Sequence, residues 1–394
     1  MYTLRGQYEK AAESYRQSLR LAPDNVVPYG DLVNSLLALQ RFDEARQVGQ
    51  QAHARKLDDY PPHMALYALA FLGADSPAMV EQQQWFAGQP EYENDGLSLA
   101  SDTEAYAGHL GKARELTKRS VDSAISADRK EIGAIWQENA ALREAAFADA
   151  TDAKQAATDG LKLAPASPGA AVEAALAFAM AGDTVRAESL ARDLNKRFPL
   201  DTQMQSLWLP TIQAQMALDK RKPALALDAL QAASSIELGA IAFVDNLSCL
   251  YPTYVRGEAY LAAGQGSGAA AEFQKILDHS GIVWNCWTGA LAHLGLARAN
   301  ALQSRTFAPR LSAFRASSEE VVASASGTSN FCTAASDSPS SPRSLAAASP
   351  SASSTFSLVA AVTCSCASVS PLWQFTAFNP STYSLPRPPT VPAM

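Results

Sequence analysis

The strongest constraint on this sequence is a pattern of helical residues that recurs with a period of 34 residues. Gly6 is followed seventeen residues later by Pro23, and the same spacing separates Gly182 from Pro199. An alanine lies five residues after each of these glycines, and apolar residues follow it at intervals of three and four. Pro165 precedes Pro199 by 34 residues, so the pattern also gives the length of one unit.

Each position of the pattern has a physical role in a pair of antiparallel helices. Glycine adopts positive φ at little cost, which suits the turn between two helices. Alanine lets the two helices approach closely, and apolar residues three and four apart form one face of a helix. Proline ends the second helix because it has no amide hydrogen to donate. The pattern therefore predicts a stack of helix pairs.

These positions resemble the tetratricopeptide repeat family, whose motif has small residues, aromatic residues and proline at fixed places. The first unit supplies Tyr2, Gly6, Ala11, Tyr15 and Pro23. The second unit supplies Tyr29, Leu32, Leu36, Phe42, Ala45 and Ala52. A late unit supplies Gly257, Tyr260, Gly264, Ala269, Phe273 and Ile276. The resemblance implies an all-α fold, an α-α superhelix (a tetratricopeptide solenoid) of about six to eight helix pairs.

The pattern divides the sequence into four regions. Residues 1–59 hold two units, the first of which lacks its first helix, and residues 60–235 hold degenerate helix pairs. Residues 236–303 hold one full unit and the first helix of a broken last unit. Residues 304–394 form a low-complexity tail that we expect to be disordered. Within the degenerate region we expect pairs at about 60–129, 131–165, 168–199 and 202–235.

Longer stretches within residues 1–303 are similar to one kind of repeat protein. They include Phe198–Thr202, Trp208–Ile212 and Tyr254–Tyr260. They resemble the C-terminal repeat region of bacterial, acidobacterial-type serine/threonine protein kinases of the eukaryotic-like class. Some related chains carry a winged-helix DNA-binding domain ahead of the repeats instead. The resemblance implies a regulatory or sensor array joined to an upstream effector domain, and both kinds of effector remain open.

The repeat pattern stops inside its last unit. A helix is predicted over 290–303, but Ser304 stands where the turn glycine is expected and Pro309 where the close-packing alanine is expected. The helix therefore lacks its partner within the unit. Residues 304–394 hold 22 Ser, 10 Pro and no Lys, too polar a composition to offset the entropy of folding. A tail with phosphorylatable Ser-Pro sites and a change of reading frame near Ser304 both explain this, and the abruptness favours the second.

Charge and cysteine content restrict the class of function. Residues 1–303 hold 27 basic and 36 acidic residues, a net charge of −9, which argues against binding to nucleic acid or anionic membranes. No apolar run reaches the ~20 residues that span a bilayer. The five cysteines are irregularly spaced, at Cys249, Cys286, Cys332, Cys364 and Cys366. We expect free thiols and a reducing compartment, with the chain cytoplasmic or the soluble part of a membrane-anchored parent.

No arrangement of residues predicts a catalytic, cofactor-binding or metal site. Gly264–Gly268 is rich in glycine, but no strand precedes it and no Lys-Ser or Lys-Thr pair follows it. The histidines do not lie at metal-ligand spacing, and His53 and His63 are expected to be solvated. Kinase motifs are absent. We therefore expect that the chain is not an enzyme; a hydrolase hidden within residues 60–165 is the alternative from another class.

Binding is the remaining expectation. A tetratricopeptide superhelix exposes the first helix of each pair on a concave wall, where a protein or peptide ligand lies. In chaperone-docking repeats Lys and Asn clamp a carboxylate there; here Asn34 has the Asn position but Gly30 replaces Lys, so chaperone docking is not predicted. The candidate peptide-binding residues are Tyr29, Asn34, Leu37 and Arg41. The alternative is that Tyr29 and Leu37 pack between repeats.

Two tryptophans flank Cys286 just before the predicted helix 290–303. For Trp284 and Trp287, burial against the neighbouring repeat is favoured over a ligand-binding box. Both are large apolar side chains, whose burial stabilises a fold more than most others do.

Overall fold

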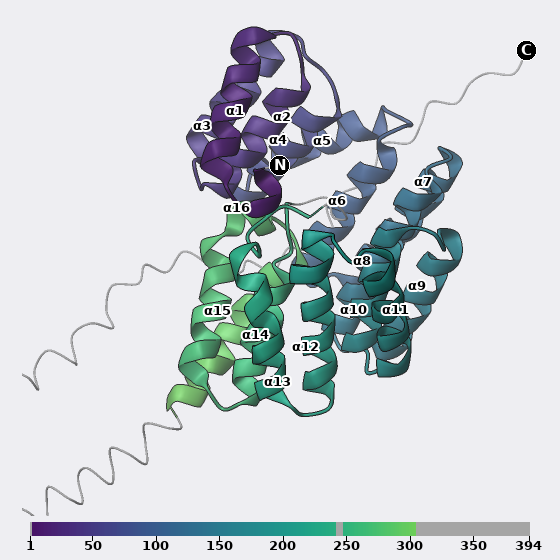
Figure 1. The fold of residues 1–394 in the computed structure, drawn as a ribbon. Coiled ribbons are helices and arrows are strands. Elements are labelled where there is room, and N and C mark those ends of the chain that lie inside the picture. Colours follow the sequence, from purple (N-terminus) through teal and green to yellow (C-terminus); the bar gives the residue numbers. More distant parts are fainter. Residues whose placement is uncertain (1, 242–246, 305–394) are drawn as a thin grey trace, which may run out of the picture. The chain divides into compact units, whose positions relative to one another are not determined.

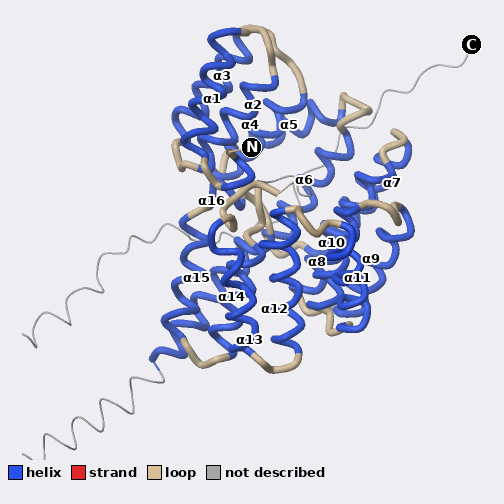
Figure 2. Tube along the Cα trace, viewed as in Figure 1, coloured by secondary structure: helices blue, strands red, loops and turns tan. Residues whose placement is uncertain are grey.

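The computed structural model describes residues 2–241 and 247–304. Every regular element in these two ranges is a helix, and neither range contains a strand (Figure 2). The all-α prediction is therefore confirmed. The predicted disordered tail lies outside the described residues except for Ser304, which ends a helix.

The helices follow one another with short connections (Figure 1). The first ten elements are η1 (Thr3–Arg5), α1 (Tyr8–Leu21), α2 (Val27–Ala38), α3 (Phe42–Ala54), α4 (Tyr60–Leu72), α5 (Ser76–Ala87), α6 (Glu93–Tyr106), α7 (Leu110–Ser126), α8 (Lys130–Ala146) and α9 (Ala150–Leu163). The next nine are α10 (Pro168–Met180), α11 (Thr184–Arg197), η2 (Met204–Trp208), α12 (Leu209–Asp219), α13 (Pro223–Ala229), η3 (Leu230–Ser235), α14 (Tyr251–Ala262), α15 (Gly266–Asp278) and α16 (Ser280–Val283). Residues 287–304 form a last helix.

Seven consecutive pairs, from α2 with α3 to α14 with α15, make up most of the described chain. We call the first helix of each pair its A helix and the second its B helix. The helix α1 is the B helix of the unit before these pairs, and helix 287–304 is the A helix of the unit after them. Each A helix from α2 to α14 packs on its own B helix, and every B helix from α1 to α13 also packs on the following A helix. The number of pairs agrees with the predicted six to eight.

The turn inside each unit contains one residue in the left-handed conformation. In the first four units these residues are 34 residues apart, at Gly6, Gln40, Ala74 and Gly108. In the next four units they are Ala148, Gly182, Arg221 and Gly264. Only half of them are glycine, although side chains disfavour positive φ. The turn position is thus kept even where the glycine that marks it in the sequence is absent.

Residues 60–129 hold two helix pairs, α4 with α5 and α6 with α7, where a single long pair was predicted. That prediction was wrong because the turn between α4 and α5 has Ala74, not glycine, in the left-handed conformation. Both pairs therefore have ordinary length, and the long loop that a single pair would need does not exist.

Small residues set the distance between the helices of a pair. The alanines at the predicted close-packing position are buried, namely Ala11, Ala45, Ala113, Ala153, Ala187 and Ala269. In the late unit, a Cβ on Gly257 of α14 would lie 2.8 Å from ring atoms of Phe273 on α15. Close packing of this kind leaves no room for an added methyl group.

The regular pattern is interrupted between α11 and α14. The element η2 is a single turn of π-helix, α13 has only seven residues, and η3 is a 3₁₀-helix. The chain after η3 then contacts the first unit: the Tyr8 hydroxyl donates to the Leu238 carbonyl at 2.8 Å, and the Ala240 amide donates to the Thr3 carbonyl at 3.0 Å. The irregular stretch therefore joins units that are far apart in sequence.

Helix 287–304 packs on the unit that precedes it. Its Gly295 lies against the ring of Phe273, and its Ala299 lies against Gly266 at the start of α15. Arg298 adds an ion pair with Glu258 of α14, at 2.8 Å. The sequence predicts that this helix lacks a partner helix within its own unit. Such a partner would follow residue 304, outside the described residues. One apolar face of this helix thus packs on the preceding unit.

Cys249 and Cys286 form a disulfide, with their Cα atoms 5.7 Å apart. The prediction of free thiols is therefore wrong for this pair. Thirty-seven residues separate the two cysteines, and the α14–α15 hairpin brings them together. The sequence spacing has no feature that would show this proximity. The other three cysteines lie outside the described residues.

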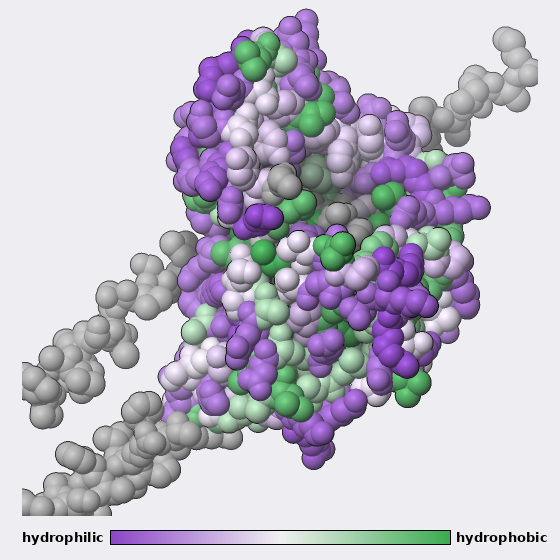
Figure 3. Space-filling model, viewed as in Figure 1, coloured by the Kyte–Doolittle hydropathy of each residue, from purple (hydrophilic) through white to green (hydrophobic). Residues whose placement is uncertain are grey.

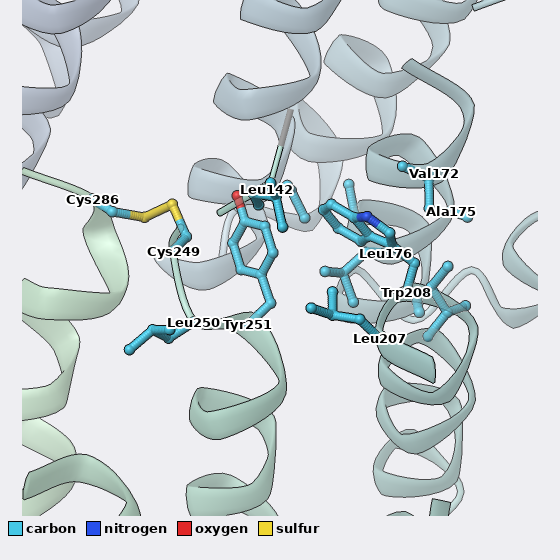
Figure 4. Packing of buried hydrophobic residues seen from close by; sticks show 14 of the residues in the cluster. Leu142, Val172, Ala175, Leu176, Leu207, Trp208, Cys249, Leu250, Tyr251 and Cys286 are labelled. Atoms are coloured by element: carbon cyan, nitrogen blue, oxygen red, sulfur yellow. A yellow bond between two sulfur atoms is a disulfide. The ribbon is translucent and has the colours of Figure 1, made fainter. Parts of the chain in front are cut away.

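The disulfide lies at the edge of the largest apolar core. Figure 4 shows it next to Leu250 and Tyr251 at the start of α14, with Trp208 beyond them. The Trp208 and Tyr251 rings are 5.6 Å apart and both are buried. This core joins residues from α8, α10, η2 and α14, so the irregular elements are part of the main hydrophobic core.

Candidate protein-interaction surface

A stretch of the chain after α15 covers the A helices of the N-terminal pairs. This closing segment, residues 280–286, begins with α16, which packs against α2 and α4 (Figure 1). We call the covered surface the A wall; it is formed by α2, α4 and α6 around Leu37, Leu69 and Leu99. The concave wall that the sequence predicts to be open is therefore occupied here by the chain itself.

The closest approach is at Gly281. A Cβ at this residue would overlap the carbonyl group of Leu37 on α2, so the two backbones touch only because residue 281 is glycine. Next to it, the Ser280 hydroxyl donates to Oε1 of Gln40 at 3.2 Å. Gln40 is the left-handed residue that ends α2. The first two residues of the closing segment thus fit the C-terminal end of α2.

Trp284 fills an apolar pocket on the A wall. Its indole is buried with Leu36 and Leu37 of α2 and with Leu69 of α4. The indole nitrogen donates to the Gly281 carbonyl at 2.9 Å. Trp284 has φ of 50° and ψ of −120°, a conformation that a bulky residue rarely adopts. The indole is thus buried, as predicted from the sequence. The sequence does not predict the unfavourable backbone conformation that this burial requires.

Asn285 connects the closing segment to α6. Its side-chain nitrogen donates to the Leu99 carbonyl at 2.9 Å and to the Thr103 hydroxyl at 3.0 Å. The Tyr67 hydroxyl of α4 lies 2.8 Å from the same Thr103 hydroxyl. The side chain is buried, and these hydrogen bonds replace those that water would make to its nitrogen, whereas its Oδ1 has no hydrogen-bond donor among the described residues. Asn285 therefore bonds to α6, and the Thr103 hydroxyl links it to Tyr67 of α4.

Two bonds hold the closing segment from the other side, and a third joins the same loop to the start of helix 287–304. The Cys249–Cys286 disulfide ties the last residue of the segment to the loop before α14. The Ser248 amide donates to the Ile282 carbonyl at 3.2 Å, and the Thr288 hydroxyl donates to the Cys249 carbonyl at 2.7 Å. The segment is therefore fixed between the A wall and the loop that leads into α14.

The A helix α10 is buried on every side from Gly169 to Ala179. Its side chains meet Trp208 and Tyr251 in the main core (Figure 4). An A helix with one solvent-exposed face would alternate buried and exposed positions. The central part of the A-helix surface is therefore closed as well.

The four candidate peptide-binding residues do not share one surface. Leu37 is fully buried under the closing segment, and Asn34 on the same helix is half-buried, with its Oδ1 hidden from solvent and without a hydrogen-bond donor among the described residues. Tyr29 is buried, and its hydroxyl donates to the Pro23 carbonyl at 3.1 Å. Tyr29 and Leu37 pack between helices, as the alternative proposes. A role of the set in binding stays a prediction.

Arg41 lies just before α3 and is already paired. It donates to Glu44 at 2.5 Å and to Glu9 at 3.3 Å. The hydrogen bond from Arg41 lowers the pKa of Glu44. The slight desolvation of the Glu44 carboxylate raises this pKa, but by less. A carboxylate ligand would have to compete with these two glutamates for Arg41.

On the outside, the described surface is hollowed between successive B helices. The first groove, between α1 and α3, has a volume of about 690 Å³, with Tyr29 and Leu32 at its base and Arg16 and Arg55 beside it. Similar grooves of about 400, 390 and 540 Å³ lie between α3 and α5, α7 and α9, and α9 and α11. Arg16 pairs with Glu44, so much of the charge at the first groove is balanced. The face seen in Figure 3 is mostly hydrophilic, with apolar side chains in separate small patches.

Several acids are buried between the A helices. Burial raises the pKa of Asp102 to about 6, against the opposing effect of Arg143, which donates to it at 2.9 Å. Burial also raises the pKa of Glu138 and of Glu173 well above the ordinary value. Asn139 donates to Glu173 at 3.1 Å. Acids of this kind are favoured in their neutral form, and they carry a pH-dependent cost to folding.

Three carboxylates, Glu144, Asp149 and Asp152, have oxygens within 4.8 Å of one another. The guanidinium of Arg114 lies among them, at 2.6 Å from Glu144, 3.3 Å from Asp149 and 3.5 Å from Asp152. The hydrogen bonds that Arg114 donates to Glu144 raise the pKa of Arg114, so the cation is firmly held. The cluster is thus an ion-pair network between α7, α8 and α9, and we assign no metal to it.

The two histidines expected to be solvated differ. His53 is exposed. His63 is half-buried, and that prediction was wrong: its ring stacks on Trp85 at 3.9 Å and its nitrogens lie 2.7 Å from Gln82 and 2.6 Å from Asp58. The α4–α5 pair, which the sequence analysis did not separate, places Trp85 opposite His63.

The chain is similar to one family model and to several solved structures. Residues 2–70 match the tetratricopeptide repeat family model. A tetratricopeptide repeat protein from Parabacteroides merdae is similar at 14% identity and a TM-score of 0.34, over 76% of this chain and 94% of that chain. Yeast Tom70 is similar at 13% identity and a TM-score of 0.36, over 77% and 80%. The tetratricopeptide repeat domain of P58(IPK) is similar at 15% identity and a TM-score of 0.20, over 76% and 95%.

No curated protein matches this sequence. The family match covers η1, α1, α2, α3 and most of α4. Among the described helices, none has both the length and the apolar character needed to cross a membrane.

Proposed function

We propose that this chain is a protein-interaction scaffold, the regulatory or sensor array of a bacterial signalling protein. Its ligand is a protein segment or peptide that lies on the A wall. The observation that carries the proposal is that this wall already holds a stretch of polypeptide, the closing segment, which is one helical turn (α16) followed by residues 284–286. A backbone contact at Gly281, a buried indole at Trp284 and an amide at Asn285 are the kinds of contact that a peptide ligand makes.

The signalling context rests on the resemblance of residues 1–303 to repeat regions linked to serine/threonine kinases. The winged-helix regulator is the alternative partner domain. Sequencing the DNA upstream of the coding segment distinguishes them: the proposal expects a kinase domain in frame. A winged-helix domain in frame would show instead that the array is part of a transcriptional regulator. The proposed scaffold role would be unchanged.

Selection from a displayed library of random peptides tests the scaffold role. The target is the full chain, presented once as isolated and once after treatment with a reductant. Asn34→Ala removes an amide from the A wall, and Gln47→Ala, at an exposed position beside the α1–α3 groove, is its matched control. We expect selected peptides whose affinity falls about tenfold with Asn34→Ala and is unchanged with Gln47→Ala.

The outcomes separate the two parts of the proposal. Peptides that lose affinity with Gln47→Ala but not with Asn34→Ala would bind on the B-helix side. That result would contradict the A-wall assignment. Failure to select any binding peptide in either state would contradict the scaffold role itself.

A further inference from the structure

We propose that the closing segment is an intrachain ligand of the A wall, locked by the Cys249–Cys286 disulfide, and that reduction of this disulfide opens the wall to a peptide with the sequence features of the segment. The proposal rests on the proposed function, because it names the ligand class and the control of the same surface. It goes beyond that function in assigning a recognition pattern and a chemical trigger.

The contacts of the segment define the ligand. Gly281 allows the backbone to touch the Leu37 carbonyl, and any larger residue would be excluded there. Trp284, three residues later, fills the pocket made by α2 and α4. Asn285 then satisfies the Leu99 carbonyl on α6. The wall therefore selects a peptide that forms one helical turn and has glycine, two further residues, tryptophan and asparagine in that order.

The disulfide is the only covalent bond that ties this segment to the loop before α14 in the described chain. The next residue, Leu250, is left-handed and buried, and Tyr251 begins α14 within the main core. Cys249 is therefore anchored on a rigid element. Without the bond, one hydrogen bond, from the Ser248 amide to the Ile282 carbonyl, remains between this loop and the segment, and Ile282 and Val283 are buried in the main core. The positive φ of Trp284 favours departure of the segment once the bond is open.

Opening the bond requires a dithiol reductant. One of its thiolates attacks a sulfur of the disulfide, which gives a mixed disulfide and one protein thiolate that takes up a proton. Its second thiolate then expels the other protein sulfur. The protein gains two electrons and two protons as two cysteines, and the reductant becomes a disulfide. The lock is therefore closed in an oxidising compartment and opens in a reducing one.

Both cysteines are only 2% exposed, so the reductant reaches them when the segment opens locally. A free peptide that captures the open wall would prevent reclosure. While the segment is tethered, its effective concentration is on the order of millimolar, and a free peptide of micromolar affinity competes poorly with it. Ligand binding and reduction should therefore promote each other.

The test measures binding of a fluorescent peptide with the sequence of residues 279–285. The full chain carries Cys332→Ser, Cys364→Ser and Cys366→Ser, so that only the disulfide responds to reductant. We expect the anisotropy titration to show at least about tenfold tighter binding after reduction, with two thiols counted by alkylation. The same peptide with alanine in place of its tryptophan is the control and should not bind.

A second measurement keeps the proposal testable if reduction weakens the fold. Hydrogen exchange of residues 280–286 should rise at least about tenfold on reduction, while exchange in α10 and α11 stays the same. Equal binding in both states, no binding in either state, or unchanged exchange with two free thiols would overturn the proposal. If peptides selected from the library bind and the 279–285 peptide does not, the intrachain-ligand proposal is overturned. The scaffold role is then still supported.

Discussion

The pairs α8 to α11 and the segments that close the A wall follow different rules. The pairs are built from contacts between neighbours in sequence, with ion pairs such as Arg186 with Asp183 on the outside. The closing segment instead joins residues about 240 positions apart, as in the bond from Ser280 to Gln40. The comparison teaches that the repeats determine the local architecture, and that a few irregular residues determine whether the A wall is open.

The largest effect should follow from removing the indole of the closing segment. Trp284→Ala should lower the free energy of unfolding by about 4 kcal/mol, because it leaves a cavity between α2 and α4. Chemical denaturation measures this change. Leu294→Ala, at a position that is 56% exposed, is the control and should change the value by less than about 0.5 kcal/mol. Similar values for both variants would show that the indole is not buried on the A wall.

The next effect concerns a buried acid that secures the irregular loop. Glu237 pairs with Arg256 of α14 and Lys275 of α15. Glu237→Gln should lower the free energy of unfolding by about 3 kcal/mol at pH 7, because it leaves Arg256 buried without its strongest partner. Lys275→Gln, which leaves the Arg256 pair intact, should cost less.

The effect of Glu237 should depend on pH. Burial raises its pKa, but hydrogen bonds from Arg256 and Lys275 lower it more, so the pKa is below the ordinary value. A lowered folded-state pKa contributes stability that is present above the unfolded value of about 4.3 and is lost as the pH falls through the folded value. The unchanged protein and Glu237→Gln should therefore differ less in their free energy of unfolding as the pH is lowered from 7 to 3, as chemical denaturation measures it. A difference that stays constant with pH would argue against the ion pair.

A smaller effect of opposite sign is expected within the regular pairs. Burial first, and then the charge of Glu173, raise the pKa of Glu138 well above its ordinary value. This acid therefore costs stability as the pH rises above the unfolded pKa of about 4.3. Glu138→Gln should raise the free energy of unfolding by about 1.4 kcal/mol or more at pH 7 and by much less at pH 4. Thermal unfolding at the two pH values checks this, and a loss of stability at pH 7 would contradict the assignment.

The smallest effect should be local. Asp183 caps α11 by accepting from the Arg186 amide at 3.2 Å. Asp183→Ala should cost about 1 kcal/mol, with faster hydrogen exchange confined to the first turn of α11. Asp193→Ala removes only an exposed ion pair with Arg197 and should cost about 0.5 kcal/mol or less. Exchange that also increases in the closing segment would show that the two regions are coupled.

The sequence predicts the helix pairs well and their number correctly, because glycine, alanine and proline act locally. Gly6, Gly182 and Gly264 are left-handed turn residues, as expected. Gln40 and Ala74 take the same conformation without any sequence signal, and for Ala74 this hid the boundary between α4 and α5. Propensity did not reveal these turns, because packing of the helices on both sides imposes the conformation.

The site was much less predictable. Burial of Trp284 follows from its size, but its pocket on α2 and α4 depends on contacts across most of the chain. The Cys249–Cys286 pair and the Asn285 bond to Leu99 likewise have no local signal. Leu37 is buried, as the packing alternative proposes, but nothing in the sequence indicates that residues 280–286 cover it.

Chemical cross-linking between the wall and the segment tests the central claim most directly. Gln40→Cys with Ser280→Cys, in the chain without the tail cysteines, is treated with a short bis-maleimide, and Arg114→Cys with Glu144→Cys is the control pair. The account predicts that peptide mapping finds a link between positions 40 and 280 within one chain, as readily as the control link. A control link without the 40–280 link would contradict the closed A wall.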